Sequence, residues 1–157
     1  MAVRVGMGFD VHAFSDDPDR RLVLGGVELA GERGLAGHSD ADVVSHAIAD
    51  ALLGAAALGD LGDHFDDSDP QWAGADSLGL LARIVEEVAG AGWRPANVDC
   101  TVALEAPRLG PHRAAMQERL RSVIGAPVSV KATSFERLGA IGRAEGVACW
   151  AVALVEA

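Results

Sequence analysis

Three residues in the first third of the chain have the types and the spacing of metal ligands. Asp10 and His12 are two residues apart in an apolar stretch, and His46 comes later in an alanine-rich stretch. Because side chains alternate along extended backbone, Asp10 and His12 are expected to point to the same side. One carboxylate and two imidazoles can hold Zn²⁺ and leave a fourth position open for chemistry. The three residues therefore form a candidate zinc site.

The helix expected over residues 40–58 would carry the third of these ligands. His46 lies one turn after Asp42 and one turn before Asp50, so the three side chains share one face. Asp50 would either accept a hydrogen bond from the second nitrogen of His46 or face solvent. Asp42 would either orient a ligand in the same way or place favourable charge near the helix N-terminus. The spacing alone leaves both alternatives open.

The other patterns predict an α+β domain of two layers, with a four-stranded mixed sheet, helices packed on one face and a small β-hairpin. Alternation and apolar content predict strands over residues 3–9, 98–104, 128–132 and 147–155. Helical periodicity and helix-start signals predict helices over residues 40–58, with Ser39 or Asp40 as N-cap, 77–90 and 111–124. The Gly25-Gly26 pair between two short apolar runs predicts the hairpin.

The last predicted strand is apolar on both of its faces. Helices can cover only one side of such a sheet, so the opposite side is expected to meet another subunit. Oligomerisation is therefore the physical expectation.

Length and composition narrow the class of protein. A chain of 157 residues is expected to form one domain, residues 1–157. A net charge of −10 argues against nucleic acid as a partner, because such proteins need a basic surface. No apolar run is long enough to span a bilayer, the start lacks a secretory pattern, and Cys100 and Cys149 have no metal-type spacing. A cytoplasmic protein with reduced cysteines is the expectation.

Several segments, in order along the whole chain, resemble the 2-C-methyl-D-erythritol 2,4-cyclodiphosphate synthase family. The matching segments are Gly8–Phe14, His38–Ala55, Asp60–Gly62, Ala106–Arg108, Lys131–Ser134 and Gly142–Gly146. The resemblance implies a bacterial or plastid enzyme of the non-mevalonate isoprenoid pathway. It would convert 4-diphosphocytidyl-2-C-methyl-D-erythritol 2-phosphate into 2-C-methyl-D-erythritol 2,4-cyclodiphosphate and CMP. It also implies a homotrimer, in which the second sheet face is buried and the active sites lie between subunits, in the bacterial cytoplasm.

The same resemblance assigns roles to individual residues. Asp10, His12 and His46 would hold Zn²⁺. Glu136 would bind a second divalent cation, Mg²⁺ or Mn²⁺, at the substrate's diphosphate. His38 and Ser134 would be the catalytic residues that stabilise the transition state.

The cytidine diphosphate substrate would contact residues from most of these segments. Asp60 and Gly62 would hold the ribose, Asp67 the methylerythritol hydroxyls, and Thr133 the nucleotide phosphates. The segment around Pro107 would form the cytosine pocket. The full implied substrate-binding set is Asp10, His12, His38, Ser39, Asp60, Leu61, Gly62, Phe65, Asp67, Ala106, Pro107, Arg108, Lys131, Thr133, Ser134, Glu136 and Arg143.

Two other functions stay open at the level of sequence. The ligand set alone also suits a zinc-dependent phosphoester hydrolase, in which a zinc-bound hydroxide attacks the substrate. The chain would then be expected to contain a second cluster of acidic and histidine ligands, and none is evident. A non-catalytic trimer that binds nucleotides or isoprenoid diphosphates is the other alternative.

Overall fold

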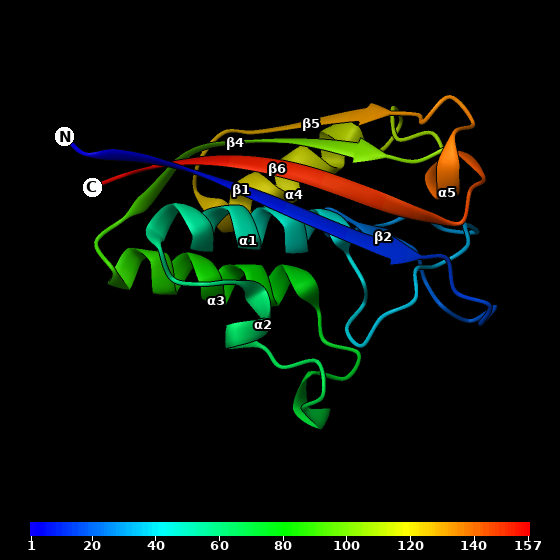
Figure 1. The fold of residues 1–157 in the computed structure, drawn as a ribbon, viewed down its shortest axis with the longest axis horizontal. Helices are drawn as coiled ribbons and strands as arrows, with labels where there is room; N and C mark the ends of the chain where they lie inside the picture. Colours follow the sequence, from blue (N-terminus) through cyan, green and yellow to red (C-terminus); the bar gives the residue numbers. More distant parts are fainter.

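A four-stranded mixed sheet forms one layer of the computed structural model, which describes residues 1–157. The strands lie in the order β1 (Val3–Ala13), β6 (Gly146–Glu156), β4 (Arg94–Ala103) and β5 (Val128–Thr133). β6 runs antiparallel to both of its neighbours, and β4 runs parallel to β5 (Figure 1). The parallel pair places the carboxyl ends of β4 and β5, and the loops that follow them, at the same edge of the sheet.

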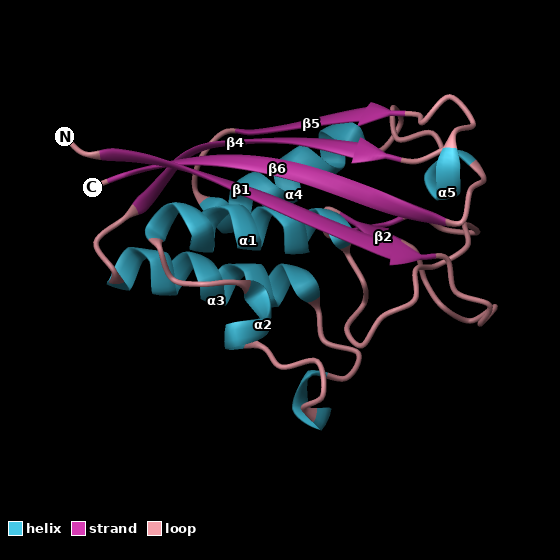
Figure 2. Ribbon diagram, viewed as in Figure 1, coloured by secondary structure: helices cyan, strands magenta, loops and turns pink.

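Three helices form the second layer and cover one face of the sheet (Figure 2). They are α1 (Val43–Ala56), α3 (Ser77–Gly90) and α4 (Arg113–Ile124). α1 lies against β1 and β6, α3 packs beside α1, and α4 packs against β5. The buried side chains of the sheet's inner face and of the three helices form one apolar core. The predicted α+β class with a mixed sheet is confirmed.

The connections contain several short elements. β2 (Val23–Leu24) pairs antiparallel with β3 (Val27–Glu28) across Gly25 and Gly26, which both have positive φ. The 59–70 loop contains α2 (Leu61–His64) and leads into the 3₁₀ turn η1 (Pro70–Trp72), and α5 (Gly139–Gly142) precedes β6. No helix is both long enough and apolar enough to span a bilayer.

The predicted start of the first helix was wrong by three residues. Ala41 has a positive φ of 57°, which ends any earlier helical turn, and the N-cap is Asp42 rather than Ser39 or Asp40. The carboxylate of Asp42 accepts hydrogen bonds from the backbone amides of Val44 and Ser45. An aspartate that satisfies two free amides at a helix start is a strong N-cap. Ser39, Asp40 and Asp42 all have side chains that suit an N-cap, so the sequence alone could not show which of them starts the helix.

The strand that carries Asp10 and His12 lies unusually close to helix α1. A Cβ atom built on Gly8 would lie 1.9 Å from the carbonyl oxygen of Ala47, and one built on Gly6 would lie 2.0 Å from that of Ala51. Glycine is therefore required at both positions, because the backbones of β1 and α1 touch without intervening side chains.

The sheet face opposite the helices is apolar and exposed. Val5, Met7 and Phe9 of β1 point to this side, as do Trp150 and Val152 of the neighbouring strand β6. Phe9 packs on Trp150 with a distance of 5.0 Å between their ring centroids. A contiguous apolar surface of this kind is typical of a protein–protein interface.

We expect Gly8→Ala to lower the free energy of unfolding by about 1–3 kcal/mol or more, because the added methyl group meets helix backbone that cannot rotate away. Urea unfolding at one fixed chain concentration measures the change. Gly90→Ala is the matched control, since a Cβ there has nothing within 4 Å. Equal stability of the two variants would contradict the close strand–helix contact.

Candidate metal centre

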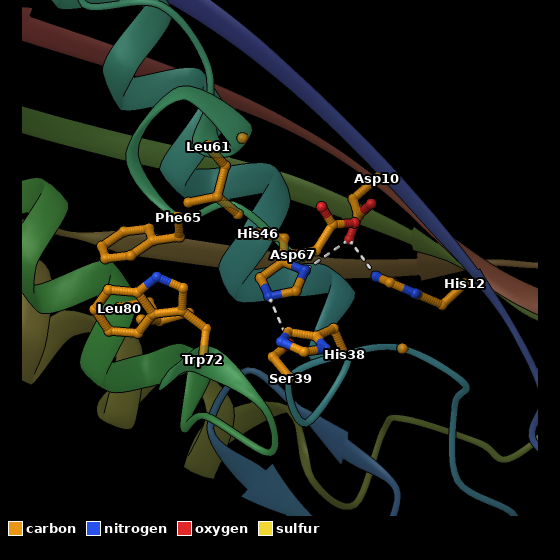
Figure 3. Close-up of a pocket in the computed structure, with 12 residues that line it drawn as sticks. Asp10, His12, His38, Ser39, His46, Leu61, Phe65, Asp67, Trp72 and Leu80 are labelled. Carbon is orange, nitrogen blue, oxygen red and sulfur yellow. Dashed lines mark hydrogen bonds and ion pairs between the residues drawn. The ribbon is translucent and has the colours of Figure 1, made fainter. Parts of the chain in front are cut away.

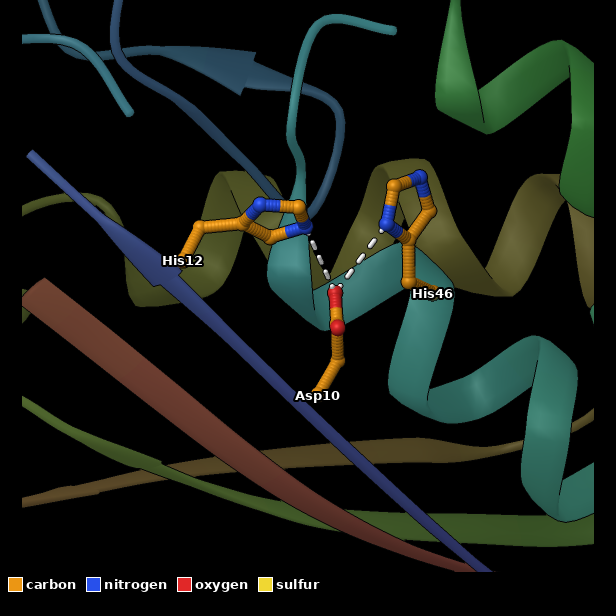
Figure 4. Close-up of side chains that lie close together, drawn as sticks. All are labelled: Asp10, His12 and His46. Carbon is orange, nitrogen blue, oxygen red and sulfur yellow. Dashed lines mark hydrogen bonds and ion pairs between the residues drawn. The ribbon is translucent and has the colours of Figure 1, made fainter. Parts of the chain in front are cut away.

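Asp10, His12 and His46 converge on one point between β1 and α1 (Figure 4). Oδ2 of Asp10 lies 3.0 Å from Nε2 of His12 and 3.0 Å from Nδ1 of His46. One ligand atom from each residue lies within 4.8 Å of the others, and no other cluster of three such residues occurs in the structure. The predicted ligand set is therefore brought together in space.

The backbone explains why these side chains meet. Asp10 and His12 alternate with the exposed residues of β1, so both point toward the helical layer. His46 lies in the first turn of α1, on the side that faces β1. The close approach at Gly8 brings the strand near enough for Asp10 to reach His46.

The outer nitrogen of His12 fixes where its ring carries a proton. Nδ1 lies 2.8 Å from the backbone oxygen of Ala36, and a carbonyl can only accept a hydrogen bond. The neutral ring therefore carries its proton on Nδ1, which leaves Nε2 with a lone pair. While the ring is neutral, Nε2 is buried and has no hydrogen-bond partner. It faces the carboxylate of Asp10, a contact that is favourable only when the ring is charged or a cation lies between the two atoms.

The pKa values of the pair reflect this arrangement. Burial alone would raise the pKa of Asp10, but hydrogen bonds and charge from His12 and His46 outweigh burial and lower it to about 2. Burial likewise disfavours a charged His12, yet the hydrogen bond and negative charge of Asp10 raise the pKa of His12 above its ordinary value of 6.5. The centre thus attracts positive charge, as a cation site must.

The outer nitrogen of His46 contacts a residue that the sequence analysis did not single out. Nε2 of His46 lies 2.8 Å from Oγ of Ser77, at the start of α3. Asp50 was one candidate to accept a hydrogen bond from this nitrogen. Its carboxylate instead accepts from the backbone amide of Leu61 at 2.8 Å. That interpretation of Asp50 was therefore wrong, because the start of α2 lies closer to the carboxylate than the histidine ring does.

Asp42 stabilises the start of α1 and does not orient a metal ligand. Its side chain is fully buried and accepts from the backbone amides of Gly25 and Gly26 in addition to capping α1. Burial raises the pKa of this carboxyl group, although these hydrogen bonds oppose the shift. Asp42 thus joins the β2–β3 turn to the helix that carries His46.

A pocket of about 260 Å³ opens beside the three ligands (Figure 3). Its other side is apolar, where Phe65 and Trp72 pack edge to face with 4.9 Å between ring centroids. Arg83 lies over both rings from outside the pocket. The site therefore combines a charged end with an apolar wall.

Half of the predicted site residues lie around this pocket. The predicted residues that line it are Asp10, His12, His38, Ser39, His46, Leu61, Gly62, Phe65 and Asp67. The ring of His38 is held by a contact of 2.9 Å between its Nε2 and the backbone oxygen of Asp69. Asp60 stands beside the pocket and caps α2 in a reciprocal arrangement with Asp63.

The other predicted residues gather elsewhere, mostly in the loops after β4 and β5. Those in these two loops, none of which lines the pocket, are Ala106, Pro107, Arg108, Ser134 and Glu136; Thr133 ends β5. The Ala106–Pro107 peptide bond is cis, and Oγ of Ser134 lies 3.2 Å from Oε1 of Glu136.

Two predicted residues of this second group are engaged with carboxylates. Lys131, within β5, forms an ion pair with Asp99 of β4. Arg143, after α5, forms an ion pair with Glu145 at 2.6 Å. Within one chain the structure therefore does not bring the residues predicted to bind cytosine and the nucleotide phosphates to the metal ligands.

Five residues at the centre were not predicted as site residues. Gly37, Trp72 and Leu80 line the pocket, and Ser77 and Asp40 form hydrogen bonds behind His46. Asp40 and Ser77 are far apart in sequence and meet only because the start of α3 packs beside α1. The position of Ser77 directly after Asp76, at a helix start, is the one local signal, and it indicates capping rather than ligand support.

Comparisons with known proteins identify the family of this chain. A profile of the YgbB family matches residues 3–156. A curated relative from Symbiobacterium thermophilum, named 2-C-methyl-D-erythritol 2,4-cyclodiphosphate synthase, is 55% identical over 154 residues, which cover 96% of this chain and 97% of the relative.

Two solved structures have the same fold. The bifunctional IspDF from Campylobacter jejuni superposes with a TM-score of 0.93 at 38% identity, covering 98% of this chain and 42% of that one. A 2C-methyl-D-erythritol-2,4-cyclodiphosphate synthase in its CDP-bound form superposes with a TM-score of 0.87 at 33% identity, covering 98% of this chain and 100% of that one. The chain therefore belongs to the YgbB family of 2-C-methyl-D-erythritol 2,4-cyclodiphosphate synthases.

Proposed function

We propose that this chain forms 2-C-methyl-D-erythritol 2,4-cyclodiphosphate and CMP from 4-diphosphocytidyl-2-C-methyl-D-erythritol 2-phosphate, with Zn²⁺ held by Asp10, His12 and His46. The supporting observation is the partnerless, buried Nε2 of His12 facing a carboxylate, next to a second imidazole. Family membership and the name of the relatives support the cyclisation. A second ligand cluster of the kind a two-metal hydrolase needs is absent from the structure.

The reaction is an internal phosphoryl transfer. An oxygen of the 2-phosphate attacks the β-phosphorus, the bond from that phosphorus to the bridging oxygen breaks, and CMP leaves with this oxygen. Because both reacting groups belong to one substrate, the protein must fold the substrate and neutralise its charge. Zinc supplies Lewis acidity toward a phosphate oxygen when it is bound.

The chain's own residues would position the methylerythritol portion of the substrate. Asp67 would hold its hydroxyl groups, while Asp60 and Gly62 would hold the ribose of the nucleotide. His38 would stabilise the charge that develops on the phosphoryl oxygens, which requires a protonated ring, because Nε2 already donates to the backbone oxygen of Asp69. A donor of this kind is typically worth about 3 kcal/mol in the transition state. The wall formed by Phe65 and Trp72 excludes water, which would otherwise yield linear hydrolysis products.

Most of the nucleotide half of the site would come from a neighbouring subunit of a homotrimer. Two observations support this: the residues predicted for cytosine and the nucleotide phosphates lie apart from the metal ligands, and the outer sheet face is apolar and exposed. The segment Ala106–Arg108 would bind cytosine, Thr133 and Ser134 the phosphates, and Glu136 would hold Mg²⁺ or Mn²⁺ there. Lys131 and Arg143 would contribute positive charge near the same ligand. Oxygen ligands from one carboxylate and a diphosphate suit Mg²⁺.

We further propose that residues 1–157 act as one domain in the bacterial cytoplasm. Cys100 and Cys149 are both free and buried, which suits a reducing compartment.

The product of the reaction tests the proposed activity. Protein with Zn²⁺ and Mg²⁺ should release CMP and the cyclic diphosphate, which phosphorus NMR distinguishes from linear phosphates. His46→Ala should abolish zinc binding and lower turnover by at least about 100-fold, because two ligands hold the ion poorly. His112→Ala is the matched control, since His112 makes no capping side-chain hydrogen bond. Linear products from the unaltered chain would refute the proposal.

The effect of zinc on thermal stability should depend on pH. Because the pKa of His12 is raised, its proton stabilises the metal-free fold, and this contribution is complete below about pH 6.5. The contribution is lost as the pH rises through the raised pKa. Zinc must displace that proton, while Asp10 with a pKa of about 2 stays ionised. Zinc should therefore raise Tm more at about pH 8 than at about pH 6. An effect that is equal, or larger at the lower pH, would contradict this account.

The outer sheet face should control assembly. We expect a trimer by light scattering at micromolar concentration, and we expect Met7→Glu to give monomers, because it would bury an unpaired charge in each interface. Met7 is 64% exposed in the single chain. Ser122→Glu on the exposed surface of α4 is the control that should leave the trimer intact. A monomeric unaltered chain would refute the proposed assembly.

A further inference from the structure

Behind His46, two residues from separate segments complete a chain of hydrogen bonds that ends on a carboxylate. Oγ of Ser77 lies 2.8 Å from Nε2 of His46 and forms a hydrogen bond with Oδ1 of Asp40. Ser77 is 1% exposed, and Asp40 is half-buried. The three side chains thus form a line from the metal centre to a carboxylate that does not touch the metal ligands themselves.

The direction of each hydrogen bond follows from what the groups can donate. An ionised carboxylate only accepts, so the hydroxyl proton of Ser77 goes to Asp40. Oγ of Ser77 then has only lone pairs to offer His46, and the ring must donate from Nε2. A neutral imidazole has one N–H, so Nδ1 keeps its lone pair and faces Asp10, 3.0 Å away.

We propose that Ser77 and Asp40 are positioning residues that hold the proton of His46 on Nε2 and thereby present Nδ1 to the metal ion. The inference rests on the zinc site of the proposed function and extends it to residues that do not touch the ion. A metal-bound histidine commonly donates its second N–H to a carboxylate, which fixes the ring and raises its basicity. Here the serine hydroxyl connects the ring to that carboxylate.

The packing around Asp40 keeps this line in place. Oδ2 of Asp40 accepts from the backbone amide of Ser77 at 3.1 Å, so one carboxylate holds both the backbone and the hydroxyl of the same residue. The backbone amide of Asp40 in turn donates to the carbonyl of Ala75 at 3.0 Å. Ser39 lies farther from the ring, with its Oγ 3.3 Å from Nε2 of His46. Ser77 is therefore the nearest partner of the ring and the more deeply buried of the two serines.

The two histidine ligands differ in a way that makes the proposal testable. The outer nitrogen of His12 donates to the backbone carbonyl of Ala36, which no side-chain substitution removes. The outer nitrogen of His46 depends on a hydroxyl group. A change at Ser77 should therefore affect one ligand and leave the other in place.

Zinc affinity of Ser77→Ala, measured by competition with a chromophoric chelator, tests the inference. We expect binding about 10–100-fold weaker than in the unaltered chain. Ser45→Ala is the matched control. Ser45 is also a buried serine that donates to an aspartate, with 2.8 Å between its Oγ and Oδ2 of Asp42, but its hydroxyl does not contact a histidine. The control should lose stability to a similar degree and keep its zinc affinity.

A nitrogen-15 NMR spectrum of the zinc-loaded proteins separates positioning from general stability. The Nε2 proton of His46 should exchange slowly with water in the unaltered chain and in Ser45→Ala, and quickly in Ser77→Ala. Equal zinc affinity and equal exchange in the two variants would overturn the inference and leave the zinc site intact. Failure of the unaltered chain to bind zinc would instead overturn the proposed function.

Discussion

The contact of strand β1 with helix α1 is the constraint on which the metal centre depends. Two glycines, Gly6 and Gly8, let the strand backbone touch the helix backbone, with no room for a Cβ atom at either position. Asp10 and His12 follow on the same face of the strand, and His46 lies in the first turn of the helix. Without this approach the carboxylate would not reach the second imidazole. The buried cap at Asp42 holds the same helix end to the β2–β3 turn.

The second constraint is electrostatic. The chain has a net charge of −10, yet its proposed substrate is a polyanion. Attraction for the substrate must therefore come from a few local sources of positive charge. The metal centre is one of them, because the lone pairs of Asp10, His12 and His46 lie together favourably only around a proton or a metal ion. Hydrogen bonds behind both imidazoles direct these lone pairs inward. A net negative charge and a centre that binds a cation are thus compatible, since the charge that matters is within a few ångströms of the reacting groups.

The local features were predictable from sequence, and the long-range contacts were not. The spacing of Asp10, His12 and His46 indicated the ligand set, and periodicity placed α3 at residues 77–90, as observed. The support of His46 by Ser77 was missed, because it depends on how α3 packs beside α1. The cap at Asp42 was missed for a related reason. Several aspartates and serines near the helix start are equally good N-cap candidates until the left-handed backbone of Ala41 is known. The grouping of the site residues into two separate sets could not be derived from spacing, because it follows from the sheet order, in which β1 and β5 lie at opposite edges.

The position of the metal ion is the most direct test of this account. Crystals of the protein grown with zinc, measured on both sides of the zinc absorption edge, would locate any bound ion by its anomalous scattering. The account predicts one strong peak coordinated by Oδ2 of Asp10, Nε2 of His12 and Nδ1 of His46. Three side chains that point apart, with no anomalous peak among them, would contradict it.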